Sequence, residues 1–527
     1  MMESACLRHS EIPGSSKLFL DFQYHFDRVA QYYGGGWPGD PESFRRAAEK
    51  LHYPDNRRAA LVDALREQNA GNPSLDVLAK PGTVAVVTGQ QVGLFSGPSY
   101  TIYKALSAAR LAHELSEQGI PAVPVFWLAT EDHDFAEVNH AYVFDSAFEP
   151  VRLEVQGSNG GQRPAGSVAV EQFPTSQLRE ALAAFPFGDK VADLVAQAYV
   201  PGATMGAAFE QLLRSLLDKW GILYVDPLNP ALRHIAAPVL SDALKNAHEL
   251  KKDLLERNKE LEQAGYHAQV HIEAQTSLFF LLDGDRRISL RPQNGGYASK
   301  DRVYSIAELV ERADQLSPNA LLRPVVQDYL LPTVCYVGGP AELAYMAQSQ
   351  VLYQRLLGRM PVMLARSGFT ILEHRAAKLL DRYGLRVQSL FQPETVVKEQ
   401  IARKLIPVHL VDEFEAVRRD VAGSLGKLQN ELTHFDPTLA NALERSRNKI
   451  LYQLAKMETK TEREALRRDA RASEEAKCLL NLVYPEKHLQ ERFYSILPFL
   501  AKHDVGLLDT IYENVNLSCP DHKVLVV

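Results

Sequence analysis

Residues 84–104 read VAVVTGQQVGLFSGPSYTIYK, and this stretch decides the fold class. Its first four residues, Val84–Val87, form a continuous apolar run, which is typical of a strand buried on both faces of a parallel sheet. A glycine-rich loop follows, and the segment after it, YTIYKALSAARLAHELSEQG, has helical periodicity. A strand, a loop and a helix in this order make up the repeating unit of an α/β fold.

Four more apolar runs of this kind lie further along the chain, at Ala122–Leu128, Gly221–Val225, Val334–Val337 and Pro361–Leu364. Polar residues able to do chemistry follow them, such as TEDHD at 130–134. Open α/β sheets bind ligands in a crevice at the carboxyl ends of their parallel strands. The sequence therefore predicts an α/β enzyme with a parallel sheet and a site along one edge of that sheet.

Changes in this pattern divide the chain into core segments, insertions and a helical domain. The core is expected at 1–150, 201–245 and 321–383, the connecting insertions at 151–200 and 246–320, the helical coiled-coil domain at 384–482, and a C-terminal segment packed on the core at 483–527. Within the second insertion, SLFFLLDGDRRISLR (277–291) indicates two strands joined by an Asp-Gly turn.

The helical domain has the periodicity of a coiled-coil hairpin. Apolar residues recur at three- and four-residue spacings on both sides of Asp436-Pro437, a pair typical of a helix N-cap followed by proline. The second helix is expected to continue through Ala476. Because such hairpins commonly serve dimerisation, we expect a homodimer.

The composition excludes several classes of protein. The 527 residues carry a net charge of −7, with 46% hydrophobic and 23% charged side chains, so a large core and no nucleic-acid partner are expected. Four widely spaced cysteines form no Cys-x-x-Cys pair, which indicates reduced thiols. Neither a signal peptide nor an apolar run of membrane-spanning length is visible, so we expect a cytoplasmic protein without a membrane partner.

The segment Thr88–Lys104 is the first candidate site. Its glycines let a ligand approach the backbone, and its place between a strand and a helix allows N–H groups to face an anion. It matches neither the Walker A loop nor the dinucleotide fingerprint, and a tight turn without a ligand is the alternative. The residues expected to take part are Thr88, Gln90, Gln91, Gly97, Tyr100, Tyr103 and Lys104.

The second candidate is the acidic cluster formed by Glu131, Asp132, His133 and Asp134, with Asn139 and His140. Adjacent carboxylates can push their pKa values apart and leave one of them a general base near neutrality. The same oxygens could bind a divalent cation, although no helical His-Glu-x-x-His pattern for zinc is present. A solvated acidic loop at the start of a helix is the alternative.

Two further segments that directly follow apolar runs are candidates for the site. Gly338, Gly339 and Glu342 lie in a strand-to-helix turn where the backbone can approach a ligand, and a structural turn is the alternative. Arg366 and Ser367 follow the last apolar run, where the guanidinium offers a fork for phosphate or carboxylate. Arg323-Pro324 and Gln327-Asp328 are expected to lie in a polar loop that reaches the same crevice.

Together these segments resemble the BshC family, the enzymes assigned to cysteine addition in bacillithiol biosynthesis. The resemblance covers nearly the whole chain in the right order. It rests on Thr88-Gly89-Gln90-Gln91, Gly93-Leu94-Phe95, Gly97-Pro98, Tyr100–Lys104, Phe126-Trp127, Glu131–Asp134, Arg323-Pro324-Val325, Gln327-Asp328, Leu331-Pro332-Thr333, Gly338–Glu342, Pro485 and Leu489–Arg492.

The resemblance implies a Rossmann-like core of the class I synthetase and nucleotidyltransferase type, with connecting insertions and a coiled-coil domain that supports a dimer. It implies a ligase that joins L-cysteine to the amino group of glucosaminyl-malate, the last step of bacillithiol biosynthesis. ATP is the expected cofactor, with Mg²⁺ as a further candidate, because an amide does not form usefully from a free carboxylate in water.

On this basis Lys104, Glu131, His133 and Asp134 are predicted to be catalytic. Lys104 and Arg366 would stabilise phosphate charge, together with helix N-termini. Glu131 or Asp134 would bind the incoming amine, or His133 would take its proton. The remaining candidates are expected to bind substrate or nucleotide, and none of them is predicted to be a metal ligand.

Two other functions fit parts of the sequence. A metal-dependent hydrolase would use Asp132, His133, Asp134 and His140. A non-catalytic scaffold would combine the coiled-coil hairpin with a degenerate nucleotide-binding core.

Overall fold

The computed structural model describes residues 5–34, 36–156, 162–273, 275–293 and 295–527. Residues 1–4 lie outside this range, and they are part of the N-terminal segment in which no signal peptide is expected. The chain forms two compact units. The sheet unit comprises Cys6–Thr370 and Gln490–Val524, and the helical unit is built around Ile371–Leu489. Among the described residues, no helix combines the length and apolar character that crossing a membrane requires.

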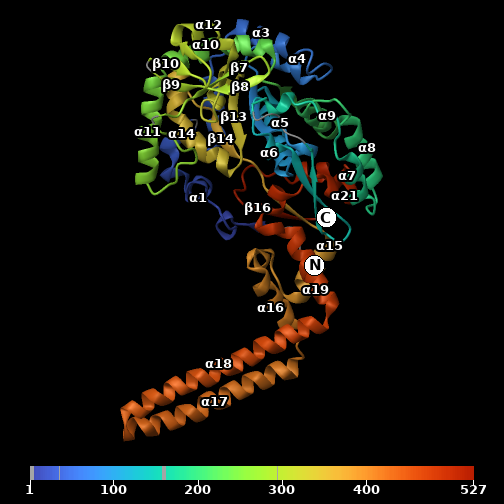
Figure 1. Ribbon diagram of the computed structural model, residues 1–527, viewed down its shortest axis with the longest axis vertical. Coiled ribbons are helices and arrows are strands. Elements are labelled where there is room, and N and C mark those ends of the chain that lie inside the picture. Colours follow the sequence, from blue (N-terminus) through green and yellow to red (C-terminus); the bar gives the residue numbers. More distant parts are fainter. Residues whose placement is uncertain (1–4, 35, 157–161, 274, 294) are drawn as a thin grey trace. The chain divides into compact units, whose positions relative to one another are not determined.

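A five-stranded parallel sheet lies at the centre of the sheet unit, as predicted (Figure 1). All five apolar runs of the sequence are strands in it. In spatial order they are β14 (Val362–Ala365), β13 (Thr333–Gly338), β2 (Val84–Gln91), β3 (Ala122–Ala129) and β6 (Leu223–Val225). Because the strands are parallel, their carboxyl ends share one edge of the sheet.

Both faces of the sheet are covered by helices, which explains why the strands are apolar on both sides. Val84 and Val86 pack on one side with α5 (Tyr100–Glu117), while Ala85 and Val87 pack on the other. Helices α10 (Pro230–Lys245), α13 (Arg323–Leu330) and α14 (Pro340–Leu356) contribute to this second core.

The segment after Val87 differs from its prediction, because Thr88, Gly89, Gln90 and Gln91 continue the strand instead of forming a loop. They remain paired with β3, and the last pair in the register is Gln91 with Ala129. Glycine is required at position 89, since a Cβ there would lie 2.7 Å from the carbonyl oxygen of Trp127. The turn itself is short, with a 3-10 segment at Leu94–Ser96 and positive φ at Gly97.

The second insertion contains the predicted hairpin. Strands β7 (Phe279–Asp283) and β8 (Arg286–Ser289) pair antiparallel, with Asp283 opposite Arg286 at the Asp-Gly turn. Strand β12 (Leu316–Pro318) adds to the other side of β7. Helix α11 (Ala247–Gln263) precedes this sheet.

The other elements of the sheet unit surround these. They include the helices α1 (Lys17–Tyr24), α2 (Pro41–Glu49), α3 (Asp55–Leu65), α4 (Ser74–Leu78), α6 (Phe135–Val138), α7 (Thr175–Leu182), α8 (Gly188–Ala198), α9 (Met205–Leu217), α12 (Ile306–Glu311), α20 (Gln490–Phe493), α21 (Leu497–His503) and α22 (Leu507–Glu513), the antiparallel pair β4 (His140–Phe144) and β5 (Pro150–Glu154), and the small sheet of β9 (Arg291–Gln293), β10 (Gly296–Ala298) and β11 (Val303–Ser305).

The helical unit contains the predicted coiled-coil hairpin, in which α17 (Val408–Phe435) and α18 (Pro437–Arg468) lie side by side (Figure 1). Asp436 caps α18 as predicted, because its carboxylate accepts the Thr438 N–H at 2.8 Å. The single helix expected through Ala476 is wrong. Asp469 interrupts it by capping a new helix, α19 (Ala470–Val483), through the Ala472 N–H at 2.9 Å.

Candidate active site

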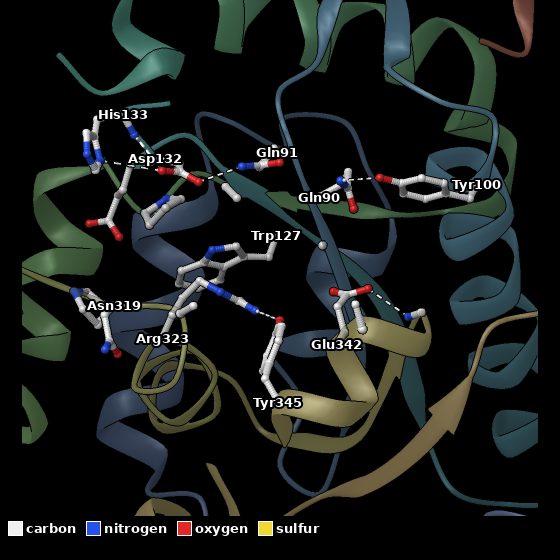
Figure 2. A pocket seen from close by; sticks show the side chains of 18 of the residues that line it. Gln90, Gln91, Tyr100, Trp127, Asp132, His133, Asn319, Arg323, Glu342 and Tyr345 are labelled. Carbon is white, nitrogen blue, oxygen red and sulfur yellow. Dashed lines mark hydrogen bonds and ion pairs between the residues drawn. The ribbon is translucent and has the colours of Figure 1, made fainter. Parts of the chain in front are cut away.

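A cavity of about 450 Å³ lies at the carboxyl edge of the five-stranded sheet (Figure 2). The predicted residues that line it are Gln90, Gln91, Tyr100, Glu131, Asp132, His133, Gly339, Glu342 and Arg366, together with Arg323. The other lining residues are Gly89, Trp127, Ala129, Pro227, Phe280, Arg287, Pro318, Asn319, Ala320, Pro340, Ala341, Tyr345 and Arg492. The cavity therefore joins four of the predicted motifs.

The end of β2 supplies two amide side chains that point to different neighbours. Gln90 donates to the hydroxyl of Tyr100 at 3.1 Å, and Gln91 donates to Asp132 Oδ2 at 2.7 Å (Figure 2). Gln91 also donates to Glu137 at 2.8 Å. Because successive strand residues face opposite directions, the two glutamines connect the strand to different walls of the cavity.

One wall of the cavity is acidic and begins with Glu131. Its carboxylate is buried and accepts from Arg233 Nη1 at 2.5 Å. Burial raises the pKa of Glu131, although the guanidinium groups of Arg233 and Arg287 oppose this effect. Glu131 is therefore already paired with a cation of the protein itself.

Asp132 and His133 meet an arginine from the second insertion. Arg287 donates from Nη1 to His133 Nδ1 at 3.0 Å, and the same nitrogen lies 3.6 Å from Asp132 Oδ1. Arg287 is buried, with its guanidinium held by Ser317 and the Pro318 carbonyl, each at 3.0 Å. Since arginine cannot accept a proton, His133 Nδ1 is the acceptor and the neutral ring carries its hydrogen on Nε2.

A second set of charged lining residues consists of Arg323, Arg366 and Arg492, and we call it the cationic wall. Arg323 donates to the Tyr345 hydroxyl at 3.0 Å (Figure 2). It stands at the first position of α13, so the polar loop predicted for this segment is wrong. Arg366 follows β14, and its guanidinium carbon lies 5.3 Å from the centre of the Tyr100 ring. Arg492 is exposed at the cavity and comes from the C-terminal segment. Three arginines from distant parts of the chain thus share one wall.

Five residues of the predicted set support this edge of the sheet without lining the cavity, and a sixth lies beneath it. Thr88 donates to the Val337 carbonyl at 2.8 Å, which ties β2 to β13. Tyr103 is buried against Phe369, and Ser367 donates its N–H to Ser107 at 3.1 Å. Gly97 forms the turn before α5, Gly338 ends β13, and Lys104 is buried beneath the cavity against Glu342.

The last three residues of the acidic cluster, Asp134, Asn139 and His140, lie outside the cavity. Asp134 is exposed, and it precedes α6. Asn139 donates to Glu154 at 3.2 Å, and the ring of His140 is 3.2 Å from the Asn139 side-chain oxygen. Both residues are thus engaged at the start of β4, and neither lines the cavity.

The geometry gives no support to a protein-held metal at this cluster. Within the described ranges, no group of three or more His, Cys, Asp or Glu side chains is arranged to hold a metal ion. Asp134 and His140, which a hydrolase of this kind would need, do not line the cavity.

Arg287, Tyr345 and Arg492 were not among the predicted site residues. Arg287 lies in a hairpin whose sequence indicates only strands and a turn, and Tyr345 lies within a helix. Arg492 belongs to the Leu489–Arg492 motif that carries the family resemblance, so this motif was the one available signal.

The cavity suits an anionic ligand such as a nucleotide phosphate. Arg287, Arg323, Arg366 and Arg492 line it, and the Nε of Arg366 is buried without a hydrogen-bond partner. A buried donor without a partner is costly, and an anion that accepts from it removes that cost.

Comparisons with known proteins agree over the whole chain. Residues 2–367 match the N-terminal Rossmann-like domain of the family "Bacillithiol biosynthesis BshC", and residues 369–527 match its C-terminal coiled-coil domain. A protein of Solibacter usitatus named "Putative cysteine ligase BshC" is 54% identical over 100% of both chains. Relatives with the same name in Koribacter versatilis and Salinibacter ruber are 34% and 32% identical, with 99% and 97% of this chain and 99% and 96% of theirs covered.

Proposed function

The chain belongs to the BshC family of bacillithiol biosynthesis, and we propose that it is a ligase joining L-cysteine to the amino group of glucosaminyl-malate. This reaction would be the last step of bacillithiol biosynthesis. The observation that carries the proposal is that one cavity is lined both by carboxylates and by arginines. Such a cavity can hold an amine and an anionic group at the same time.

Asp132 is the residue that would bind the amino group of glucosaminyl-malate. Glu131 is neutralised by Arg233, and Asp134 is exposed outside the cavity. Asp132 faces the cavity and is oriented by Gln91 at 2.7 Å. When the carbon–nitrogen bond forms, the attacking amine must lose a proton, and a carboxylate beside it can accept that proton.

His133 suits a donor role better than the base role predicted from the sequence. Arg287 occupies its Nδ1, so the neutral ring offers the Nε2–H. His133 would therefore donate a hydrogen bond to an oxygen of the substrate.

The cationic wall would hold the anionic partners of the reaction. ATP, with Mg²⁺, would supply the activation that a free cysteine carboxylate lacks, and Arg323, Arg366 and Arg492 are the residues that would hold its phosphates. The same guanidinium groups suit the two carboxylates of the malyl group. Lys104 would act indirectly, because it is buried and contacts the cavity-lining residues Gly89, Gln90 and Glu342 from beneath.

The test is a reaction of the purified protein with glucosaminyl-malate, cysteine, ATP and Mg²⁺, followed by mass spectrometry of the thiol products. We expect an ATP-dependent product from the wild type. Asp132→Asn should lower its rate by about 100-fold or more, which is typical for loss of a proton acceptor. Asp134→Asn, two residues away but outside the cavity, should stay near the wild-type rate.

Two results would contradict the proposal. An inactive, folded wild type with verified substrates would exclude this reaction for the isolated protein. Equal losses in Asp132→Asn and Asp134→Asn would show that the cavity is not where the amine reacts.

We further propose a cytoplasmic homodimer formed through the α17–α18 hairpin. Ile450 and Met457 lie seven residues apart on α18 and are 42% and 52% exposed, and this heptad spacing suits packing against a second hairpin. The double variant Ile450→Glu/Met457→Glu should sediment as a monomer, whereas Lys449→Glu should sediment like the wild type. A wild type that is monomeric at micromolar concentration would contradict the dimer.

A further inference from the structure

Arg366 is held so that only one of its edges can serve a ligand. Its side chain is 5% exposed, yet it lines the cavity. Nη1 and Nη2 both donate within the protein, to Glu491 and to the Ser367 carbonyl. Nε is buried without a partner, 3.8 Å from where a Cβ of Gly339 would lie. The edge formed by Nε and the second hydrogen of Nη2 is therefore the one whose donors remain available.

Glu491 makes the contacts that fix this arrangement. Its Oε1 accepts from Nη2 at 2.6 Å and its Oε2 accepts from Nη1 at 2.8 Å, which is the bidentate geometry of a carboxylate and a guanidinium. Oε2 also accepts the Phe369 N–H at 3.1 Å. Glu491 is 3% exposed and does not line the cavity, so it contacts Arg366 from behind.

The carboxylate of Glu491 is in turn packed against a second fixed group. His522 is fully buried, and its Nε2 lies 2.8 Å from Thr370 Oγ1. A Cβ at Gly368 would lie 2.6 Å from His522 Nδ1 and 3.2 Å from Glu491 Oε2, so both side chains close around this glycine. Any larger residue at position 368 would displace one of them.

We infer that Glu491 is a positioning residue for Arg366: it occupies both terminal nitrogens of the guanidinium and directs the Nε edge toward the anionic ligand of the cavity. Gly368 and His522 keep the Glu491 carboxylate in place. The inference rests on the proposed function only in taking this cavity as the ligand site. An arginine without this carboxylate could rotate its terminal nitrogens into the cavity, which would change the direction from which an anion is bound.

The test has a structural and a binding arm. Crystal structures of the wild type and of Glu491→Gln are compared, and we expect the Arg366 side chain to leave its wild-type position in the variant. Binding of ATP and of glucosaminyl-malate is then measured separately by calorimetry for the wild type, Glu491→Gln, Arg366→Gln and the double variant. For the ligand held by Arg366, Glu491→Gln should weaken binding by about 10-fold, because the guanidinium is no longer preorganised.

The double variant distinguishes positioning from general damage. If Glu491 acts through Arg366, the double variant should bind like Arg366→Gln alone, to within about twofold, because the two residues share one effect. Glu491→Asp, which keeps the charge, should recover part of the loss, and the exposed Glu513→Gln should bind like the wild type.

The inference is overturned if Arg366 keeps its position in Glu491→Gln, or if the losses of the two single variants add. If Glu491→Gln does not fold, Gly368→Ala is used in its place, since it displaces the same carboxylate without removing it. Failure of the proposed reaction is a separate result, because the position of Arg366 is measured without turnover.

Discussion

Lys104 Nζ lies 2.7 Å from Glu342 Oε2, in a pair whose lysine is fully buried while its carboxylate borders the cavity. The same ammonium donates to the Gly89 carbonyl and to Gln90 Oε1. Glu342 also accepts from the Tyr336 hydroxyl at 2.6 Å and from the Gly339 N–H at 2.8 Å. One ion pair thus ties α5 to the end of β2 and to the start of α14, three elements that form the cavity.

Replacing Lys104 should therefore damage both stability and turnover. Lys104→Met leaves Glu342 without its cation, and breaking such a pair typically costs about 3 kcal/mol. We expect a loss of this size in the free energy of unfolding, measured by urea denaturation, with product formation lost as well. The double variant Lys104→Met/Glu342→Gln should be more stable than Lys104→Met, since no uncompensated charge remains. A single variant as stable as the wild type would show that the pair contributes little.

The Glu491 carboxylate predicts a specific dependence of stability on pH. Burial alone would raise its pKa, but Arg366 outweighs this effect and lowers the pKa of Glu491 to about 2. Because the folded-state pKa lies below the ordinary value of 4.5, the stabilisation is complete above pH 4.5 and is lost as the pH falls toward 2. It amounts to about 3 kcal/mol at neutral pH, because each tenfold change in an ionisation constant corresponds to about 1.4 kcal/mol.

The measurement is the difference in unfolding free energy between the wild type and Glu491→Gln at several pH values. The difference should be constant from pH 7 to about 4.5 and should shrink at lower pH. Glu513→Gln, an exposed change of the same kind, should show no such trend. A difference that stays constant down to about pH 3 would contradict the lowered pKa.

The fold was predictable because its signals are local. Val84–Val87 and the four other apolar runs are buried on both faces of one sheet, and a strand of this kind is continuous in the sequence. Asp436-Pro437 likewise marks a helix start by itself. The break at Asp469 was missed because an aspartate on a charged helix indicates a solvated position as readily as an N-cap.

The site was predictable only in part, because the residues that the hairpin contributes to the cavity have no local signal in the sequence. Gln90 and Gln91 end β2 and Asp132 follows β3, and strand ends are where an α/β sheet binds ligands. Arg287 and His133 are separated by 154 residues, and their contact depends on how an insertion folds over the sheet edge. Such a contact cannot be read from spacing along one chain.

Replacing Gly89 should destabilise the parallel sheet at the pairing of β2 with β3. In Gly89→Ala the new Cβ would lie 2.7 Å from the Trp127 carbonyl oxygen and 2.9 Å from the Trp127 Cβ, so β2 and β3 would have to separate. We expect a loss of about 2 kcal/mol in unfolding free energy, in the range of overpacking in a core. Gly506→Ala, where no atom lies within 4 Å of the new Cβ, should be nearly neutral. Equal effects of the two changes would contradict the close approach of the strands.

Arg287 predicts that the second insertion takes part in the reaction. Its guanidinium lies 3.9 Å from the centre of the Phe280 ring and donates to His133 Nδ1, so it sets both the position of that imidazole and its tautomer. Arg287→Met removes the donor and keeps much of the length of the side chain. We expect product formation to fall by about 100-fold, because a misplaced catalytic group typically costs that much. Arg287→Lys should recover only part of it, since an ammonium cannot reproduce the planar fork.

The neighbouring Arg286 provides the matched control for Arg287. It is exposed on the same strand, bonds to Gln162 and does not line the cavity, so Arg286→Met should keep the wild-type rate. The two variants change the same residue type on one hairpin, and only the face of the strand differs. A loss confined to Arg287→Met, with an unchanged free energy of unfolding, would assign the insertion to the active site. Equal losses in both variants would instead show that the hairpin acts only through its stability.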